Sequence, residues 1–312
     1  MKASVYSAAL FAVLSAAAPL EKRQSSDIDE TILNYALTLE HLEAAFYTES
    51  LAKFSASDLE KAGFKETNFY KNFKKISRDE TSHVAVIQQI QASKGYSSVK
   101  ACTYDFKVTT PRQFVVTSSL LEGVGTSAYL GAAAVVTDKS ILTAAGSILT
   151  TEARHTAFLR NLRDQSPFAQ AYDTPLGFKQ VFSLAASFIV ECPSDNPDLG
   201  ITAFPSLTPK KASYKNLDEI VFTIGEDATI PDGDLYVAWP TVLGPIFKQA
   251  TVDTSARTAT VKVPGAGAAG TIGQSYAVLT TSGTSLTDDN TVAGPAVVNI
   301  ASPYLTKKGS KN

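Results

Sequence analysis

The chain has 312 residues, 44% of them hydrophobic, which is enough for one large domain or two ordinary ones. Its formal net charge is −2 at pH 7, and no basic patch with interleaved aromatic residues occurs. We therefore expect no nucleic-acid partner. No stretch beyond the N-terminal segment reaches the ~20 apolar residues of a membrane helix, so we also expect no integral membrane segment.

Residues 1–18 have the composition of a secretory signal peptide, because a basic residue precedes an apolar run that ends in small residues. Residues 19–23 end in a Lys-Arg pair, which indicates a short pro-segment, although an ordinary charged surface pair is the alternative. We expect a secreted, extracellular protein. Its mature chain is predicted to have two domains, at 24–200 and 205–312.

The first of these domains has the apolar spacing and end signals of amphipathic helices. Four long helices are predicted at 27–54, 66–94, 111–137 and from Asp138 or Ser140 to 165, with a fifth, shorter helix at 175–190. The link at 95–110 is long enough for a crossover along a helix bundle. Small residues crowd the middle of the third helix, and they either leave room for a substrate or allow close packing.

From about residue 204 the pattern changes to short β-like runs between prolines. The runs lie at 219–224, 235–239, 258–263, 275–280 and 296–300. Their spacing and the turn residues between them predict a small β-sandwich. The expected fold class is therefore mainly α, a four-helix bundle, with a C-terminal β domain.

Two of the three histidines stand three residues after a glutamate, as Glu80-x-x-His83 and Glu152-x-x-His155. On a helix, residues i and i+3 project from one face, so each pair can bind one metal ion. Both pairs lie on an otherwise apolar stripe of their helix, which places them in the interior. A buried carboxylate is unfavourable unless it is paired or bound to a cation.

An internal repeat selects two further glutamates in the first and third helices. Glu40 is followed by Tyr47 after seven residues, and Glu122 by Tyr129 after seven residues. We predict Glu40 and Glu122 as bridging or terminal ligands. Glu43 aligns with a glycine, so it is a substitute ligand, a group behind the ligands, or an exposed helix carboxylate. The two tyrosines are candidate catalytic residues that donate electrons or hydrogen bonds; ordinary core residues are the alternative.

Four carboxylates and two imidazoles in this order are the ligand set of a dinuclear centre inside a four-helix bundle. The oxygen-rich set suits two iron or manganese ions, and the histidines do not exclude zinc.

The chain has two cysteines, Cys102 and Cys192. In a secreted protein an even number indicates a disulfide, and two free thiols are the alternative. Such a link would close a loop of about 90 residues, which stabilises by on the order of 4 kcal/mol in the chain-entropy model.

The stretch Asn-Tyr-Ala-Leu-Thr-Leu-Glu-His-Leu-Glu-Ala-Ala-Phe-Tyr at 34–47, followed by Arg-Asp-Glu-x-x-His at 78–83 and Thr-Glu-Ala-Arg-His at 151–155, resembles a secreted ferritin-like family. This family includes plant desiccation-related proteins and fungal stress- or sexual-development-associated proteins. The resemblance covers about residues 27–195, with weaker motifs beyond. It implies a ferritin-like fold and the same six ligands. The wider superfamily includes ferroxidases, manganese catalases and di-iron oxygenases.

The function expected from these patterns is that of a secreted oxidoreductase whose dinuclear iron or manganese centre acts on O2 or peroxide. The alternative is a non-catalytic, stress-related extracellular or cell-wall protein. In that case the metal centre is structural, and the C-terminal domain binds a wall component or another protein.

Overall fold

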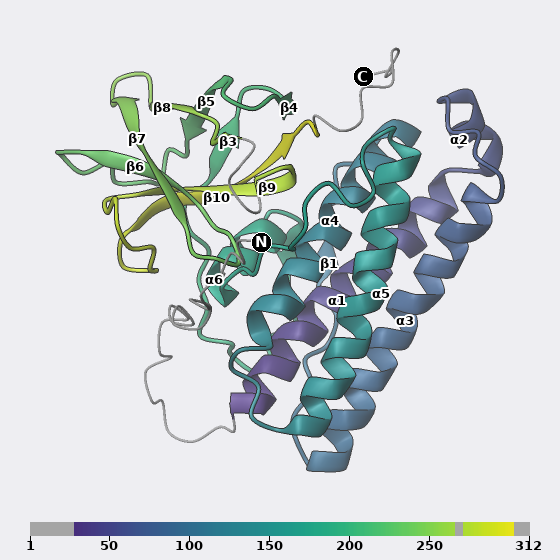
Figure 1. Ribbon diagram of the computed structural model, residues 1–312. Coiled ribbons are helices and arrows are strands. Elements are labelled where there is room, and N and C mark those ends of the chain that lie inside the picture. The colour runs from purple at the N-terminus through teal and green to yellow at the C-terminus, as the bar shows by residue number, and fades with distance from the viewer. Residues whose placement is uncertain (1–27, 266–270, 303–312) are drawn as a thin grey trace, which may run out of the picture.

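The structure is a computed structural model that describes residues 28–265 and 271–302. A bundle of long helices is followed by a β-domain, and the two lie side by side (Figure 1). The predicted signal peptide and pro-segment lie outside the described residues. None of the helices in the described part of the chain has the length and apolar character needed to span a membrane.

Four long helices form the bundle, as the sequence predicts. They are α1 (Ile28–Lys53), α3 (Phe69–Lys94), α4 (Pro111–Ala132) and α5 (Lys139–Leu162). Helix α1 packs mainly against α3, and α4 packs mainly against α5. The bundle is therefore built from two helix pairs, and each pair corresponds to one half of the internal repeat.

Local sequence signals set the ends of these helices. Thr110 and Gln113 form a capping box in front of α4, with Pro111 at its first position. Asp138 caps α5 by accepting hydrogen bonds from the N–H groups of the next turn, which decides between the two predicted caps. Helix α3 ends at Gly95, whose φ of 72° lies in the left-handed region that glycine adopts without strain.

Helix α4 ends at Ala132, earlier than the predicted end at 137. The physical reason is a tertiary contact. Both oxygens of the Asp29 carboxylate, in the first turn of α1, accept hydrogen bonds from Thr137 and the N–H of Asp138 at 2.7–2.8 Å. These contacts hold the chain in a connection between α4 and α5 instead of a continued helix.

Two short elements complete the helical region. Helix α2 (Ala56–Lys61) was not predicted, although Ser55 and Asp58 form a capping box in front of it. Helix α6 (Phe178–Ala186) is shorter than predicted, because the chain passes into β2 (Ile189–Glu191), which pairs with β1 (Thr103–Tyr104).

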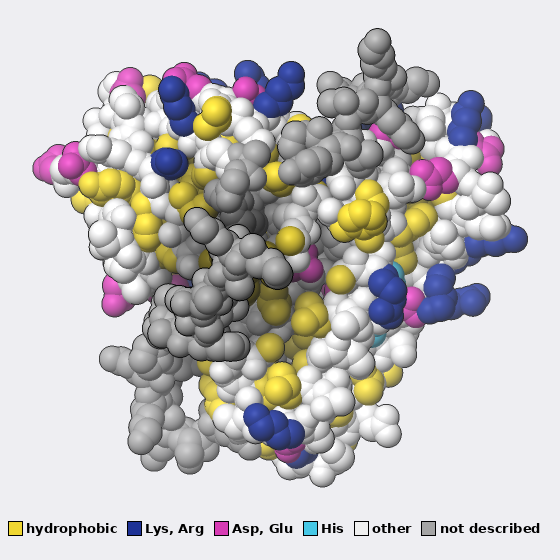
Figure 2. Space-filling view, in the orientation of Figure 1, with side chains coloured by type: hydrophobic (Ala, Val, Ile, Leu, Met, Phe, Trp, Pro, Cys, Tyr) yellow, Lys and Arg dark blue, Asp and Glu magenta, His cyan; other side chains and the backbone are white. Residues whose placement is uncertain are grey.

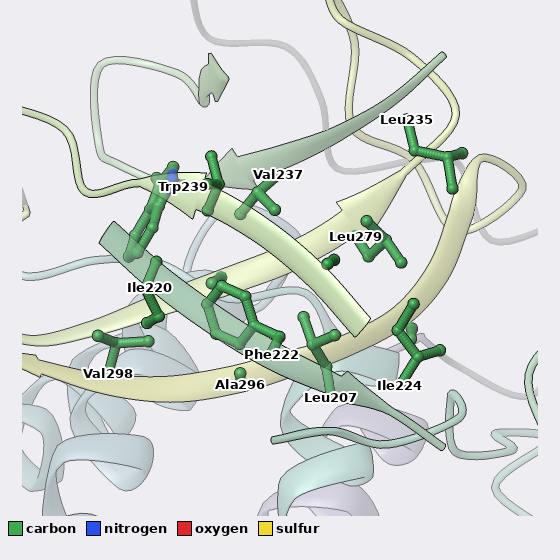
Figure 3. Packing of buried hydrophobic residues seen from close by; sticks show 14 of the residues in the cluster. Leu207, Ile220, Phe222, Ile224, Leu235, Val237, Trp239, Leu279, Ala296 and Val298 are labelled. Atoms are coloured by element: carbon green, nitrogen blue, oxygen red, sulfur yellow. The ribbon is translucent and has the colours of Figure 1, made fainter. Parts of the chain in front are cut away.

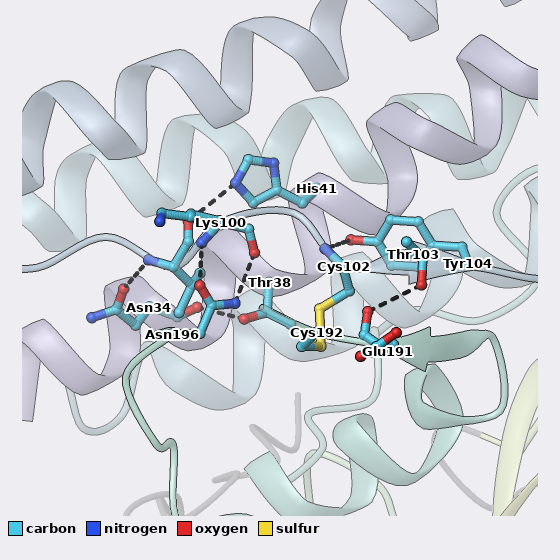
Figure 4. The surroundings of a disulfide bond; sticks show 11 residues. Asn34, Thr38, His41, Lys100, Cys102, Thr103, Tyr104, Glu191, Cys192 and Asn196 are labelled. Carbon is cyan, nitrogen blue, oxygen red and sulfur yellow. Dashed lines mark hydrogen bonds between the residues drawn. A yellow bond between two sulfur atoms is a disulfide. The ribbon is translucent and has the colours of Figure 1, made fainter. Parts of the chain in front are cut away.

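A disulfide joins Cys102 to Cys192 beside this small ribbon, which confirms the predicted link (Figure 4). Asn196 reinforces the junction, because its side chain exchanges two hydrogen bonds with the backbone of Lys100 at 2.8 and 2.9 Å. The connection after α3 is thereby fixed to the segment that follows α6.

In its described residues, 207–265 and 271–300, the β-domain has eight strands. They are β3 (Leu207–Pro209), β4 (Ser213–Tyr214), β5 (Glu219–Ile224), β6 (Leu235–Trp239), β7 (Ile246–Asp253), β8 (Thr258–Lys262), β9 (Gly273–Thr280) and β10 (Thr291–Ile300). The five predicted runs match β5, β6, β8, β9 and the end of β10. Strands β3, β4 and β7 were missed; β3 and β4 are short, and β7 alternates between half-buried and exposed positions without a strongly apolar face.

The strand order is β3-β5-β8-β7-β6-β9-β10-β4, antiparallel except for the pair β10–β4. Strand β7 pairs with β6 through its first half and with β8 through its second half. The sheet therefore curls and encloses one core around Phe222, Val237 and Trp239 (Figure 3). The two layers of the predicted sandwich are thus parts of one continuous curled sheet.

The β-domain packs closely on α4. Gln274 donates a hydrogen bond to the carbonyl oxygen of Leu120 at 3.1 Å. A Cβ added at Gly123 would lie 2.4 Å from the Gln274 side chain, and one added at Gly131 would lie 1.9 Å from the carbonyl oxygen of Leu176. At these two positions the small residues of α4 serve close packing and leave no substrate space.

Candidate metal centre

Each long helix contributes to one cluster of acidic and imidazole side chains in the bundle core. Glu40 comes from α1, Glu80 and His83 from α3, Glu122 from α4, and Glu152 and His155 from α5. All four glutamates are fully buried, and the histidines are 7% and 8% exposed. Buried apolar residues flank these positions along α3 and α5, so the helix faces that enter the core carry the polar groups inward.

Two overlapping groups of residues can be distinguished, and within each group every residue offers a potential ligand atom that lies within 4.8 Å of those of the other members. The first group contains Glu40, Glu80, His83 and Glu152, and the second contains Glu80, Glu122, Glu152 and His155. Glu80 and Glu152 are therefore shared between the two groups, whereas each of the other four residues, Glu40 and Glu122 among them, belongs to a single group.

Both imidazoles turn their Nδ1 atoms toward the carboxylates. His83 Nδ1 lies 3.1 Å from Glu80 and 3.3 Å from both Glu40 and Glu152. The centroids of the two imidazole rings are 6.5 Å apart, and the ring planes are inclined by 26°, so the rings are nearly parallel.

His155 Nδ1 lies 3.0 Å from Glu122 and 3.2 Å from Glu80, while its Nε2 lies 3.3 Å from Asp79. Asp79 was not singled out from the sequence, although it directly precedes Glu80. A carboxylate on the far nitrogen fixes the orientation of a metal-binding imidazole and increases its basicity. The position of Asp79 directly before the Glu-x-x-His motif is the one feature of the sequence that could have indicated this role.

The two candidate tyrosines bind Glu40 and Glu122 reciprocally. Tyr47 of α1 donates a hydrogen bond to Glu122 of α4 at 2.5 Å, and Tyr129 of α4 donates one to Glu40 of α1. Each tyrosine of the repeat thus holds the glutamate of the other half. Burial raises the pKa of both phenols well above the usual value, so both remain protonated donors.

The carboxylates differ in protonation because burial and hydrogen bonding compete. Burial raises the pKa of Glu40 to about 7, and it also raises the pKa of Glu122 and, further, of Glu152 and Glu43. At Glu80 burial acts in the same direction, but hydrogen bonds with both imidazoles outweigh it and lower the pKa to about 2.

For the two imidazoles, burial and hydrogen bonding change the pKa in the opposite directions to those for the carboxylates. Burial lowers the pKa of His155, but hydrogen bonds with Glu122 and Glu80 outweigh this and raise it to about 10. Three carboxylates raise the pKa of His83 in the same way. Without a metal ion, protons on the two imidazoles therefore supply positive charge to the cluster.

The residues present fit a pair of divalent cations. Glu152 Oε2 is buried without a hydrogen-bond partner. Glu152 Oε1, Glu40 Oε2 and Glu80 Oε1 are also buried, and each has only an imidazole nitrogen nearby, at 3.2–3.3 Å. Buried anionic oxygens of this kind are unfavourable unless a cation binds them. Four ionised glutamates carry four negative charges, which two divalent cations with neutral imidazoles would balance.

Glu43 lies next to the cluster but belongs to neither ligand group. It is buried, with 4% exposure, which excludes the alternative of an exposed helix carboxylate. A Cβ added at Gly125 would lie 2.8 Å from Glu152 and 3.2 Å from Glu43. Gly125 therefore leaves the space into which both carboxylates extend. This contact explains the glycine without any need for space for a substrate.

Comparisons with known proteins agree with this geometry. Residues 28–165, which span α1 to α5 and contain all six clustered residues, match the family model described as a ferritin-like domain. The helical region is ferritin-like. The chain is also 27% identical over 182 residues to Protein rds1 of Schizosaccharomyces pombe. That alignment covers 58% of this chain and 44% of rds1, so it spans less than half the length of the relative.

Proposed function

We propose that the protein is a secreted oxidoreductase with a dinuclear iron or manganese centre that acts on dioxygen or peroxide. The observation that carries the proposal is the sharing of Glu80 and Glu152 between two adjacent ligand groups. Two carboxylates that are common to both groups are what a carboxylate-bridged metal pair requires. Such a pair, when bound, supplies two-electron exchange with dioxygen or peroxide.

The chain's own residues would organise this chemistry. Glu40 and His83 would hold one ion, and Glu122 and His155 the other, between the bridging carboxylates. Tyr47 and Tyr129 keep their protons, and their hydrogen bonds orient the terminal glutamates. Asp79 holds the far nitrogen of His155. Burial of the glutamates, histidines and tyrosines excludes bulk water from the reacting region.

The location and partners of the protein form part of the same proposal. The Cys102–Cys192 disulfide supports an oxidising, extracellular compartment. On the face shown in Figure 2, Lys and Arg side chains lie in separate places instead of one basic patch. The proposed substrate of the buried centre is a small molecule, and a protein or cell-wall partner is proposed for the β-domain.

The second candidate function is non-catalytic, and the disulfide and the extensive packing of the β-domain on α4 favour it. In that case the metal pair stabilises the bundle, and the β-domain provides the functional surface. Turnover of peroxide or oxidation of ferrous iron by loaded protein distinguishes the two candidates, because a structural centre binds metal without either reaction.

Metal analysis of purified, reconstituted protein tests the proposal. Wild type should hold about two iron or manganese ions per chain. Glu152→Gln should lower this number, because it removes a bridging carboxylate. Glu49→Gln changes an exposed glutamate of α1 and should leave it unchanged. Wild type without tightly bound transition metal would sink the proposal.

A further inference from the structure

An apolar cavity lies inside the bundle on one side of the clustered carboxylates. Residues of all four long helices line it, including Leu33, Ile87, Tyr129, Ala145 and Ile148. Its volume is about 30 Å³, and its walls are almost entirely apolar. Since a water in a protein interior needs two to four polar partners, this cavity is expected to remain dry.

The cavity lies directly beside the candidate metal centre. Tyr129 lines the cavity, and its hydroxyl group donates a hydrogen bond to Glu40. Ile87 follows His83 by four residues on α3, and Ile148 precedes Glu152 by four residues on α5, so both lie one turn from a candidate ligand. The cavity therefore adjoins the centre on the side of Tyr129.

The cavity is also near the protein surface. Ile90 of α3 and Ala145 of α5 both line it and are only half-buried. The cavity therefore approaches the surface between α3 and α5, where its lining side chains are apolar.

Size limits the occupant. A single water requires about 10–15 Å³ of such volume, whereas a cavity of roughly 150 Å³ is known to bind benzene. A cavity of about 30 Å³ accordingly takes a molecule of two heavy atoms and excludes a ring or an acyl chain.

We propose that this cavity is a dry binding site for dioxygen, and that it makes the adjoining centre react with dioxygen in preference to hydrogen peroxide. Dioxygen is apolar and has two heavy atoms, as the cavity requires. Hydrogen peroxide has the same number of heavy atoms, but its two hydroxyl groups would lose their hydrogen bonds to water without replacement. The binding site is independent of metal, whereas the preference rests on the proposed function.

The first test is xenon binding to metal-free protein, measured by xenon NMR or in pressurised crystals. Xenon should bind wild type, because it occupies dry apolar cavities. Ala145→Leu adds three carbons to the wall and should weaken binding by about tenfold or more. Ala85→Leu is the matched control, because Ala85 is exposed on α3 and does not line the cavity. If Ala145→Leu fails to fold, Ala145→Val makes the same comparison.

The second test compares oxidants on ferrous-loaded protein. Each dioxygen takes two electrons and two protons to become hydrogen peroxide. Each peroxide takes two electrons and two protons to become two waters, so both arms consume two ferrous ions per oxidant. In wild type, dioxygen should oxidise the bound ferrous iron faster than hydrogen peroxide does. Ala145→Leu should slow oxidation by dioxygen by about tenfold and leave the rate of oxidation by peroxide unchanged.

The two tests separate the possible failures. Absence of xenon from wild type would overturn the cavity site whether or not the protein binds metal. Xenon binding in a protein that holds no metal would retain the site and reject both the proposed function and the oxidant preference. Equal slowing of the two oxidant arms in Ala145→Leu would also overturn the preference.

Discussion

The hydroxyl of Tyr276, in β9, donates a hydrogen bond of 2.9 Å to the carbonyl oxygen of Gly123, in α4. Gly123 directly follows Glu122, a candidate ligand. The same carbonyl oxygen also accepts a hydrogen bond from Ser127, so a buried network connects the β-domain to the helix backbone beside the candidate metal centre. The β-domain therefore supports the helix that carries Glu122.

Tyr276→Phe is expected to destabilise the protein by about 1–2 kcal/mol, because it removes a buried hydroxyl from this network. Urea unfolding followed by circular dichroism measures the change. Tyr172→Phe is the control, because Tyr172 is 54% exposed and its variant should unfold as wild type does. Equal stability of all three proteins would contradict the structural role assigned to Tyr276.

A fragment comprising residues 24–200 should keep helical circular dichroism and metal binding, because all six clustered residues lie within it. It should melt at a lower temperature than the full chain. Without β9, the apolar surface of Val124 and Ala128 that packs around Tyr276 becomes exposed to water. Complete loss of both helicity and metal binding would show that the bundle and the β-domain are a single folding unit.

Two glycines of neighbouring helices should respond oppositely to alanine. Gly131→Ala in α4 should destabilise by several kcal/mol or prevent folding, because its Cβ would lie 1.9 Å from the backbone oxygen of Leu176. Gly146→Ala in α5 meets no atom within 4 Å and should stabilise by up to ~1 kcal/mol through higher helix propensity. Thermal and urea unfolding measure both changes. Similar behaviour of the two variants would refute the assigned contact.

Replacing Cys102 and Cys192 together by serine should lower the free energy of unfolding by on the order of 4 kcal/mol, since the bond closes a loop with a sequence separation of 90 residues. Peptide mapping of non-reduced wild type should show the cross-linked pair. Free thiols at both positions in freshly purified, non-reduced protein would contradict the link.

Metal binding at pH 7 should release at least two protons per chain, because both imidazoles have raised pKa values in the metal-free protein and must be neutral to bind metal. Release from carboxyl groups with raised pKa values, such as Glu152, would add to this number. Apparent metal affinity should therefore fall as the pH is lowered. Calorimetric titration in buffers of different ionisation enthalpy measures the protons, and binding without proton release would contradict these protonation states.

The sequence by itself determined the helical bundle and the set of polar residues in its core. Three-residue spacing places Glu80 with His83, and Glu152 with His155, on one helix face, and the apolar stripes direct that face inward. These are local properties of a helix. The disulfide was also predictable, because the chain offers one pairing of its two cysteines.

Only the tertiary structure decided how the halves of the chain meet. Tyr47 binds Glu122, and Tyr129 binds Glu40, only because helices that are distant in sequence lie side by side. The same arrangement brings Glu80 and Glu152 into both ligand groups. Asp29 likewise sets the end of α4 from another helix. Helical periodicity specifies which face of each helix is buried, but the packing of complete side chains determines which partner that face meets.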